Sequence, residues 1–362
     1  MRIGIDAREI GGRATGVGRY LGGLIREWTG SREARRHEFV LYAPGDFALA
    51  VDTRHFATRR IKGAGGTFWE QVQLPQAIAR DHLDIWFSPA YSMPLRLRIP
   101  AVVAIHDLSF VAHPEWFRVR EGARRRLLSR HSAEKARAVV TISEFSRGEL
   151  IERLGLPGGK IHVIPPGIEH PVKTNPTNSS ARICPNRVLF VGSIFNRRHV
   201  PDLVRAFAAI ARRHEDAALD IVGDNRSHPR ENIRRVIAAE QLERRVRWHQ
   251  YVSDAHLQEL YSAARAFAFL SEYEGLGLPP LEALAAGIPP VLIDTAVARE
   301  SCRDAALYVP AGDIPATTRA LETALTDEAV RGRILAAAHD ALAQYDWPTA
   351  AARTLAVLES VA

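Results

Sequence analysis

Two carboxylates, Glu274 and Glu282, flank a segment rich in glycine and proline, with seven residues between them. The apolar run at residues 266–270 predicts a strand before this segment. Residues 281–286 favour a helix that Gly287 ends. A glycine loop between a strand and a helix N-terminus collects free backbone N–H groups and the positive end of a helix dipole, and anions bind there. A carboxylate beside such a site needs hydroxyl partners, and a nucleotide sugar carries a diphosphate between two diols.

The loop and the first turn of this helix contain the backbone donors. Pro279 and Pro280 suit a first helical turn, where no amide hydrogen is required. The amides that we expect to hold the phosphates are those of Gly275, Leu276, Gly277 and Leu278. A strand, a glycine loop and a helix with unrelated acids nearby also occur in many α/β proteins, so this alternative remains open on the segment alone.

The segment resembles the glycosyltransferases of family 4, whose motif at this place is close to E-G-F-G-L-P-x-L-E-A-M-A-x-G-x-P-V. Here Leu276 replaces the Phe and Pro290 replaces the first Val, and neither change removes a polar contact. The resemblance implies a retaining enzyme of the GT-B fold, an α/β architecture of two doubly wound Rossmann-like domains facing a cleft. The implied activity is transfer of a hexose from a nucleotide sugar to a hydroxyl group.

Length and composition agree with a globular chain of two domains. The chain has 362 residues, of which 25% are charged and 46% hydrophobic. No apolar run approaches the roughly 20 residues of a membrane span. Met1 leads directly into a strand without a signal peptide, and the two cysteines form no disulfide or zinc pattern. We therefore expect a cytoplasmic protein.

The order of apolar runs predicts the domain organisation. Residues 1–170 are expected to form an N-terminal, acceptor-side Rossmann-like domain, which a C-terminal helix at 347–362 joins. Residues 171–185 are rich in Pro, Asn, Ser and Thr and predict a linker, and residues 186–346 a nucleotide-sugar-binding domain. The strands are expected at residues 2–7, 39–42, 84–87, 101–105, 139–142 and 161–164, and then at 187–191, 219–222, 246–248, 266–270, 291–293 and 306–309. A helix is expected at residues 68–80.

A second glycine loop, at residues 11–18, follows the first strand and precedes a helix from about Arg19. Gly16 and Gly18 would let backbone approach a phosphate or a sugar. The loop is not a dinucleotide fingerprint, because Leu21 stands where the third glycine belongs. A plain tight turn explains it equally well. In the resembled family, however, a strand ending I-D-A-R and a loop T-G-x-G-R-Y open the chain, and this loop faces the donor.

His106 follows the apolar strand at residues 101–105. Ligands of open parallel sheets bind at the carboxyl ends of strands, where a histidine can hydrogen-bond a sugar hydroxyl. A structural turn histidine is the alternative. The run I-H-D-L-S-F is similar to family members in which this His contacts the donor sugar near the reacting carbon.

Arg197 and Arg198 follow the strand at residues 187–191 and precede a helix. Two cations in such a loop can clamp a diphosphate, and the alternative is a pair of exposed loop arginines. The resembled family commonly has Arg and then Lys here. Arg keeps the charge and offers a planar fork of donors, but it is bulkier than Lys.

The basic excess lies in the N-terminal half, with 26 Lys and Arg against 18 Asp and Glu in residues 1–170, and 22 against 23 in the rest. The strongly basic stretch at residues 118–137 predicts a helix. A helix of this kind is a solvated face or a contact to an anionic membrane or a polyprenyl diphosphate acceptor. We therefore predict a peripheral membrane contact, at the inner face of the membrane, and no nucleic acid partner.

The resemblance assigns a role to each candidate. Glu282 would bind the ribose diol, Glu274 the 3- and 4-hydroxyls of the sugar, and His106 would lie near the anomeric carbon; Glu274 and His106 are the catalytic candidates. With no D-x-D and no His/Cys cluster in the sequence, we expect no metal and no cofactor, so Arg197, Arg198 and the helix N-terminus neutralise the leaving diphosphate.

The donor is expected to be GDP-mannose, because chains with this opening resemble mannosyltransferases, and UDP- and dTDP-sugars stay open. The expected acceptor is a growing surface polysaccharide or a lipid-linked oligosaccharide. Three rivals belong to other classes: a GT-B sugar-nucleotide epimerase, a non-catalytic sugar-nucleotide-binding protein, and an NAD oxidoreductase, which would need a complete glycine fingerprint.

Overall fold

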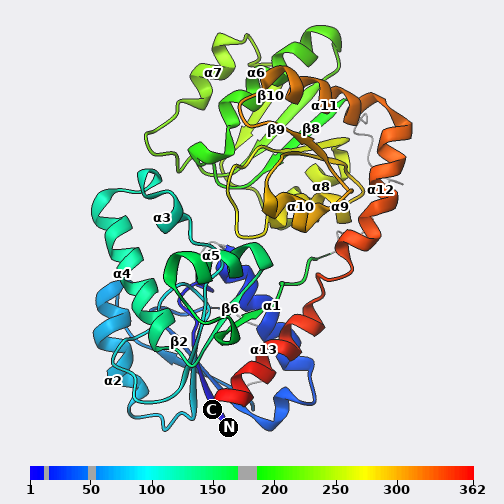
Figure 1. Ribbon diagram of the computed structural model, residues 1–362. Coiled ribbons are helices and arrows are strands. Elements are labelled where there is room, and N and C mark those ends of the chain that lie inside the picture. Colours follow the sequence, from blue (N-terminus) through cyan, green and yellow to red (C-terminus); the bar gives the residue numbers. More distant parts are fainter. Residues whose placement is uncertain (12–15, 48–53, 170–185) are drawn as a thin grey trace. The chain divides into compact units, whose positions relative to one another are not determined.

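Parallel strands form two separate sheets in the computed structural model, which describes residues 1–11, 16–47, 54–169 and 186–362. The first sheet belongs to a unit made of Met1–Gly167 and Tyr345–Ala362, and the second to a unit made of Ile168–Gln344 (Figure 1). The predicted linker at residues 171–185 lies outside the described residues.

The sheet of the first unit has the strand order β3-β2-β1-β4-β5-β6-β7. Its strands are β1 (Arg2–Asp6), β2 (Glu38–Ala43), β3 (Phe56–Arg60), β4 (Ile85–Ser88), β5 (Ala101–Ala104), β6 (Ala138–Thr141) and β7 (Ile161–Val163). The helical elements are α1 (Gly16–Gly30), η1 (Ala34–Arg36), η2 (Trp69–Gln73), α2 (Leu74–Ile78), α3 (Ser109–Ala112), η3 (Pro114–Trp116), α4 (Val119–Lys135), α5 (Glu144–Leu154), η4 (Gly158–Lys160) and α13 (Trp347–Val361).

Both faces of this sheet are buried, which is why its strands are apolar runs without polar alternation. Along β2, Phe39 and Leu41 join a cluster with α1 and α13, whereas Val40 and Tyr42 join a second cluster on the opposite face. The helices therefore cover the sheet on both sides, which is the doubly wound arrangement predicted from the sequence.

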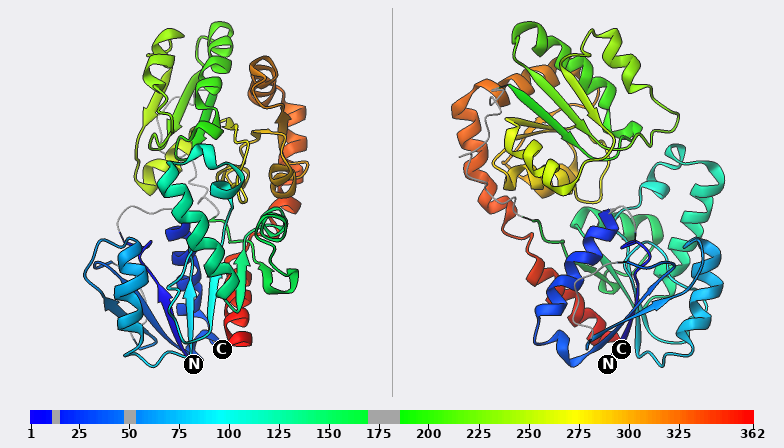
Figure 2. Two further views of the ribbon diagram at one scale, coloured as in Figure 1. Left: turned by 60° about the vertical axis from the view of Figure 1, so that its left-hand side comes forward. Right: turned by 180° about the vertical axis from the view of Figure 1, so that it is seen from behind.

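The last helix, α13, packs beside α1, and both chain ends lie close together (Figure 2). Trp28 of α1 donates a hydrogen bond from Nε1 to the carbonyl of Ala351 at 3.0 Å. His37 and Glu359 are paired at 2.9 Å. The unit is thus built from the two ends of the chain.

The sheet of the second unit has the order β10-β9-β8-β11-β12-β13. Its strands are β8 (Arg187–Val191), β9 (Ala218–Val222), β10 (Val246–His249), β11 (Ala266–Phe269), β12 (Pro290–Ile293) and β13 (Leu307–Val309). The helical elements are η5 (Asn196–Arg198), α6 (Val200–Arg213), α7 (Ile233–Ala239), α8 (Asp254–Ala263), α9 (Leu278–Ala285), α10 (Ala296–Cys302), α11 (Ile314–Thr326) and α12 (Glu328–Leu342).

Each predicted strand is present within one or two residues of its expected bounds, but β3, α7, α10 and the short helical elements η1, α3, η3, η4 and η5 were not predicted. Strand β3 lies at the sheet edge, and its arginines Arg59 and Arg60 leave no apolar run to detect. Helices α7 and α10 are only seven residues long and carry little periodicity. The single helix expected at residues 68–80 contains a π-helical turn, η2.

Candidate functional site

The loop before α9 has the predicted form of strand, glycine loop and helix N-terminus. Gly277 is the N-cap of α9 and adopts a left-handed φ of 87°, which favours glycine. The first amides of a helix have no partner within the helix, but Pro279 and Pro280 have no amide hydrogen. The helix itself therefore offers the amides of Gly277 and Leu278 to a ligand.

Glu274 lies in this loop, and its carboxylate is tied to the loop after β8. Its Oε1 accepts hydrogen bonds from Nε of Arg198 at 2.7 Å and from Oγ of Ser271 at 2.8 Å. Nε of Arg197 lies 3.8 Å from the same oxygen. The side chain of Glu274 is only 15% exposed, so these contacts are made largely out of water.

The two arginines determine the charge of this carboxyl group. Burial alone would raise the pKa of Glu274, but the charges of Arg198 and Arg197 and the hydrogen bonds of Arg198 and Ser271 outweigh burial and lower the pKa. Glu274 is therefore ionised at neutral pH. Among these three side chains, two guanidinium groups face one carboxylate.

Arg197 and Arg198 are held by aromatic rings and by backbone. Both guanidinium groups lie over the ring of Phe195, at 4.4 and 5.4 Å from its centroid, and Arg198 also lies over Phe269 at 4.8 Å. Arg198 donates from Nη1 to the carbonyl of Ser193 at 2.9 Å. The side chains are 11% and 10% exposed, so the alternative of two exposed loop arginines is wrong.

Backbone contacts fasten the arginine loop to the glutamate loop. The amide of Glu272 donates to the carbonyl of Arg197 at 3.0 Å, and Nε of Arg197 donates to the carbonyl of Tyr273 at 3.0 Å. His199 lies 2.8 Å from the carboxylate of Glu272. The two loops therefore form one structural block at the carboxyl ends of β8 and β11.

A small pocket with about 270 Å³ of empty volume, part of it open to solvent, lies beside this block. Its walls come from β11, the glutamate loop, α9, β12 and α10. The predicted residues among its lining are Glu274, Leu276 and Gly277. Most of the other lining residues are apolar, so the pocket combines one charged group with an apolar wall.

Glu282 lies one turn into α9 and is half buried. Its Oε2 accepts a hydrogen bond from the hydroxyl of Tyr261 on α8 at 2.9 Å. Tyr261 is itself buried, so this contact fixes the direction of the carboxylate. Glu282 is not among the residues that line the pocket.

His106 belongs to the first unit and is buried at the end of β5. Its Nε2 lies 2.7 Å from the carbonyl of Pro89, and its ring packs edge-on against Tyr20 of α1, with centroids 4.7 Å apart. Burial lowers the pKa of His106, although the hydrogen bond to Pro89 and the charge of Asp107 act in the opposite direction. The ring is therefore neutral at pH 7, with its proton on Nε2 and a lone pair on Nδ1.

The expectation that Gly16 and Gly18 lie in a loop is wrong, because α1 already begins at Gly16. Both glycines are in the first turn of the helix, Gly16 exposed and Gly18 buried. Residues 12–15 of the predicted loop lie outside the described residues. The correction therefore moves both glycines from the expected loop into the helix.

The structure thus joins Glu274, Arg197 and Arg198 directly. It places Glu282 on the helix that follows, and the amides of Gly277 and Leu278 at the start of that helix. Gly16, Gly18 and His106 belong to the other unit and are described there. Sequence reasoning missed Ser271 and Tyr261, the two hydroxyls that hold the glutamates. Ser271 lies three residues before Glu274, a spacing that a turn brings together, whereas nothing in the sequence indicates that Tyr261 faces Glu282.

The described residues contain neither a metal-binding cluster nor a membrane-spanning helix. Within residues 1–11, 16–47, 54–169 and 186–362, no group of three or more His, Cys, Asp or Glu side chains could hold a metal ion. No helix in these ranges is long and apolar enough to cross a membrane.

Known families and proteins match both halves of the chain. Residues 14–170 match the model described as "Glycosyltransferase Family 4", and residues 177–340 match "Glycosyl transferases group 1". The O-antigen chain mannosyltransferase B of Escherichia coli is 27% identical over 288 residues, which are 76% of this chain and 74% of that protein. An alpha-D-kanosaminyltransferase of Streptomyces kanamyceticus is 26% identical over 257 residues, 67% of this chain and 66% of that protein.

Solved structures match the fold over nearly the whole chain. The sucrose-phosphate synthase of Thermosynechococcus elongatus superimposes with a TM-score of 0.82 at 18% identity, over 99% of this chain and 98% of that one. HepE of Anabaena, solved in complex with UDP-glucose, has a TM-score of 0.76 at 18% identity, over 99% and 100%. The two family models, the parallel sheets and the loop before α9 agree, and the chain belongs to glycosyltransferase family 4 and has the GT-B fold.

Proposed function

We propose that this protein transfers a hexose, with retention and without a metal ion, from a nucleotide sugar to a hydroxyl group of a glycan or lipid-linked acceptor. The observation that carries the proposal is the ionised Glu274, held by Arg198 and Ser271 on the loop that opens α9. A carboxylate oriented beside helix amides and two guanidinium groups suits a ligand with both hydroxyls and phosphates.

Each group of the second unit takes a part of the donor. Glu274 uses Oε1 for its protein contacts among the described residues, so Oε2 would accept hydrogen bonds from the 3- and 4-hydroxyls of the sugar. The amides of Gly277 and Leu278 would bind the phosphates, and Glu282, fixed by Tyr261, would bind the ribose diol.

Arg197 and Arg198 would stabilise the leaving diphosphate. One of their two charges is offset by Glu274, and the remaining positive charge matches the negative charge that grows on the diphosphate as the glycosidic bond breaks. Because aromatic rings and backbone carbonyls hold both side chains, this charge is already in place before the donor binds.

His106 would contact the hexose near its reacting carbon. Its neutral ring donates to Pro89 through Nε2, so its contribution to the donor is a hydrogen-bond acceptor at Nδ1. It does not supply a positive charge to the transition state at neutral pH.

The donor sugar is proposed to be mannose carried by GDP, in line with the names of several relatives, among them the mannosyltransferase of Escherichia coli. UDP- and dTDP-sugars are the alternatives. A thermal-shift screen over GDP-, UDP- and dTDP-sugars, followed by an assay for slow hydrolysis, identifies the donor. A sugar-nucleotide epimerase would release free sugar, and a non-catalytic binder would shift in melting temperature without any turnover.

Substitutions of the two glutamates and of the arginine test the assignment. Glu274→Gln is expected to lower turnover, and Glu282→Ala is expected to weaken nucleotide binding measured by calorimetry. Each effect should be ~10-fold or more, because a charge-assisted hydrogen bond contributes about 1.5–3 kcal/mol. Arg198→Ala is expected to lower turnover more than donor affinity. Unchanged nucleotide affinity in Glu282→Ala would remove this residue from the site, and unchanged turnover in Arg198→Ala would refute the diphosphate clamp.

A peripheral contact to an anionic membrane is proposed for the surface formed by η2 and α4. Arg124 of α4 donates to Thr67, which places this arginine beside Phe68, a ring that is 67% exposed. Leu127, 58% exposed, follows within one turn of the helix. Cationic groups that surround a few exposed apolar side chains fit the head-group region of an anionic bilayer.

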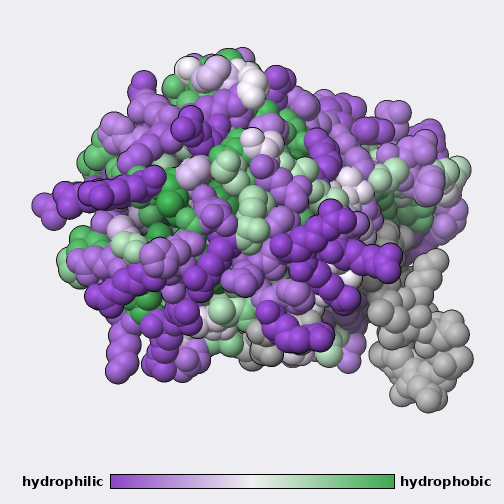
Figure 3. All heavy atoms as spheres, turned by 90° about the horizontal axis from the view of Figure 1, so that it is seen from below, coloured by the Kyte–Doolittle hydropathy of each residue, from purple (hydrophilic) through white to green (hydrophobic). Residues whose placement is uncertain are grey.

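The face turned to the viewer in Figure 3 is mostly hydrophilic, with only small hydrophobic patches. The membrane contact proposed for the surface with Phe68 and Arg124 therefore needs a direct test. Sedimentation with vesicles of phosphatidylglycerol and phosphatidylcholine, compared with phosphatidylcholine alone, tests it. Binding that is lost in Phe68→Ser and at high salt supports a membrane contact at the cytoplasmic leaflet. Equal sedimentation with both vesicles would contradict it.

A further inference from the structure

A buried ionic network lies at the carboxyl end of β1, and the proposed function does not use it. Arg8 donates from Nε to Oδ2 of Asp6 at 2.9 Å, and its Nη2 binds both Asp6 and Glu70. The two acids are each 2% exposed and the arginine side chain 14%. Two buried carboxylates that share one guanidinium form a rigid group, since separating any pair would leave an unpaired charge out of water.

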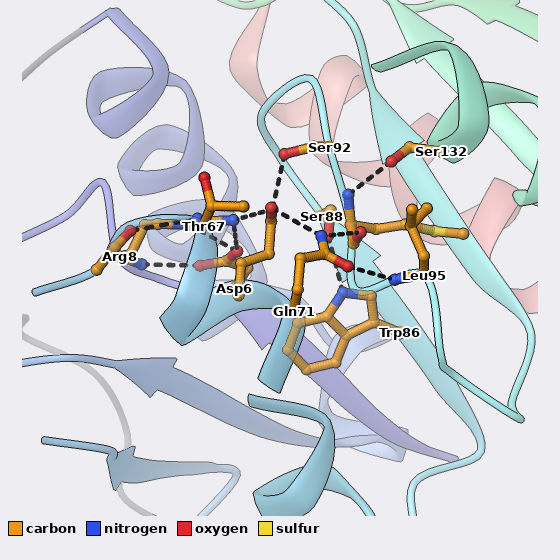
Figure 4. Close-up of polar contacts among 12 residues, drawn as sticks. Asp6, Arg8, Thr67, Gln71, Trp86, Ser88, Ser92, Leu95 and Ser132 are labelled. Carbon is orange, nitrogen blue, oxygen red and sulfur yellow. Dashed lines mark hydrogen bonds and ion pairs between the residues drawn. The ribbon is translucent and has the colours of Figure 1, made fainter. Parts of the chain in front are cut away.

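The network holds the segment at residues 89–93, which follows β4. Glu70 accepts a hydrogen bond from Oγ of Ser92 at 2.7 Å, and its neighbour Gln71 donates to the carbonyl of Met93 at 3.0 Å. Figure 4 shows Arg8 beside Asp6, and it shows Ser92, Gln71 and Leu95 in the same set of contacts. Glu70 joins them, because it binds Arg8, Ser92 and Gln71, and Gln71 in turn accepts from the amide of Leu95. Both Glu70 and Gln71 belong to the π-helical turn η2, an uncommon element that is frequent at functional sites.

The segment has a conformation that it would not adopt unaided. Tyr91 has a φ of 50°, in the left-handed region that residues other than glycine rarely occupy. Such a residue persists only where its surroundings fix it. Ser92 and Met93 follow Tyr91 directly in the chain, and Glu70 and Gln71 hydrogen-bond to these two residues.

The other side of the same segment holds His106 and the residue after it. The carbonyl of Pro89 is 2.7 Å from Nε2 of His106, and the hydroxyl of Tyr91 donates to Oδ2 of Asp107 at 2.6 Å. The Tyr91 ring also lies edge-on to His106, with centroids 5.8 Å apart. The position of the Pro89 carbonyl decides which ring nitrogen carries the proton.

We propose that Arg8, Glu70 and Ser92 are positioning residues, which fix the ring orientation and the tautomer of His106 through the strained segment at residues 89–93. The chain of contacts runs from Asp6 and Arg8 to Glu70, from Glu70 to Ser92, and from this segment to the imidazole. The link to catalysis rests on the proposed function, in which Nδ1 of His106 accepts a hydrogen bond from the donor.

The test is the tautomer of His106, read from nitrogen chemical shifts in protein labelled with ¹⁵N-histidine. The His106 signals are assigned as those missing in His106→Gln. The wild type is expected to show a single tautomer with the proton on Nε2. Ser92→Ala, which removes the hydroxyl bound to Glu70, is expected to show both tautomers, and Ser92→Thr to restore the wild-type pattern.

Ser129→Ala is the matched control, because Ser129 is also buried in this unit and its hydroxyl has no partner among the described residues. It is expected to leave the His106 signals unchanged. Glu70→Gln, which removes the charge but keeps the shape, is a second arm that is expected to resemble Ser92→Ala. Wild-type His106 signals in both folded variants would overturn the proposal.

Kinetics separate this inference from the proposed function. Ser92→Ala is expected to lower kcat by ~10-fold with little change in KM for the donor, and Ser92→Thr to recover it. If His106→Gln keeps full turnover while Ser92→Ala still changes the tautomer, positioning is supported and the catalytic use of His106 fails. If the tautomer is unchanged, positioning fails whatever the turnover.

Discussion

One carboxyl oxygen, Oε1 of Glu274, receives two hydrogen bonds from its own chain, from Arg198 and Ser271. Glu274 and Arg198 are 76 residues apart in the chain. The sequence places each of them after a strand, and both strands are central in one sheet, but the sequence does not indicate that a proposed sugar-binding acid and a proposed phosphate-binding cation form a pair. The side chains that hold a site are set by packing, which the residue types alone do not specify.

Ser271→Ala tests how far this pairing depends on the hydroxyl. The variant leaves Glu274 bound to Arg198 but less well oriented. We therefore expect donor affinity to fall by about 3- to 10-fold, less than the full effect of a hydrogen bond to a charged group, because Arg198 still holds the carboxylate. Calorimetry with the donor measures the change. Ser301→Ala is the control, because Ser301 is buried and lines the same pocket but donates to a backbone carbonyl of α10. An equal loss in both variants would mean that the pocket wall matters and the contact to Glu274 does not.

His106 should make stability depend on pH. Its pKa in the folded protein is lowered by burial below the ordinary value of 6.5, so the unfolded chain takes up a proton first as the pH falls. The contribution of His106 is fully present above pH 6.5 and is lost as the pH falls through the lowered folded pKa. Denaturant unfolding from pH 7.5 to 5 should show a smaller slope of unfolding free energy in His106→Gln than in the wild type.

His131→Gln is the control for this slope, because the side chain of His131 is 51% exposed. Its slope is expected to match that of the wild type. A wild-type slope in His106→Gln as well would show that other groups carry the pH dependence.

At the scale of elements, the buried parallel strands were predictable and the short pieces were not. Strand β8 has the predicted bounds. The N-cap of α5 is Ser143, a residue type that favours this position, and its side chain accepts from the amide of Ser146. The helix at residues 68–80 was expected to be regular, because a π turn depends on contacts such as those of Glu70 and Gln71 that no periodicity shows.

Gly192 shows how closely the elements around the arginines fit. A Cβ at this position would lie 2.6 Å from Nη1 of Arg198, and its φ of 144° is unfavourable for other residues. Gly192→Ala should therefore displace Arg198 from Glu274 and lower the unfolding free energy by roughly 1–3 kcal/mol, the usual effect of overpacking. Chemical denaturation and a turnover assay measure the two effects.

Gly332→Ala, in the middle of α12 with open space around the position, is the matched substitution. It should raise stability by roughly 0.5–1 kcal/mol and leave turnover unchanged. If Gly192→Ala also left turnover unchanged and did not lower stability, the close packing between Gly192 and Arg198 would matter for neither property.

At the scale of the whole chain, the stability of the first unit depends on residues near both ends of the chain. Leu358 of α13 is fully buried in the cluster that also contains Ile3 and Leu24. Leu358→Ala should lower the unfolding free energy by about 2–5 kcal/mol. Hydrogen exchange should then rise in peptides of β1 and α1 and stay unchanged in those of β8 and α9, whereas a uniform rise would mean that the two units unfold together.

Because α13 belongs to the first unit, the two units become complete in a fixed order during synthesis. A ribosome releases residues 168–344, a complete unit, before it releases residues 345–362, which supply the final helix of the other one. Until then, the apolar residues of β1 and α1 that α13 will cover remain open to water or to a chaperone. The part of the chain that is made first is therefore the part that finishes folding last.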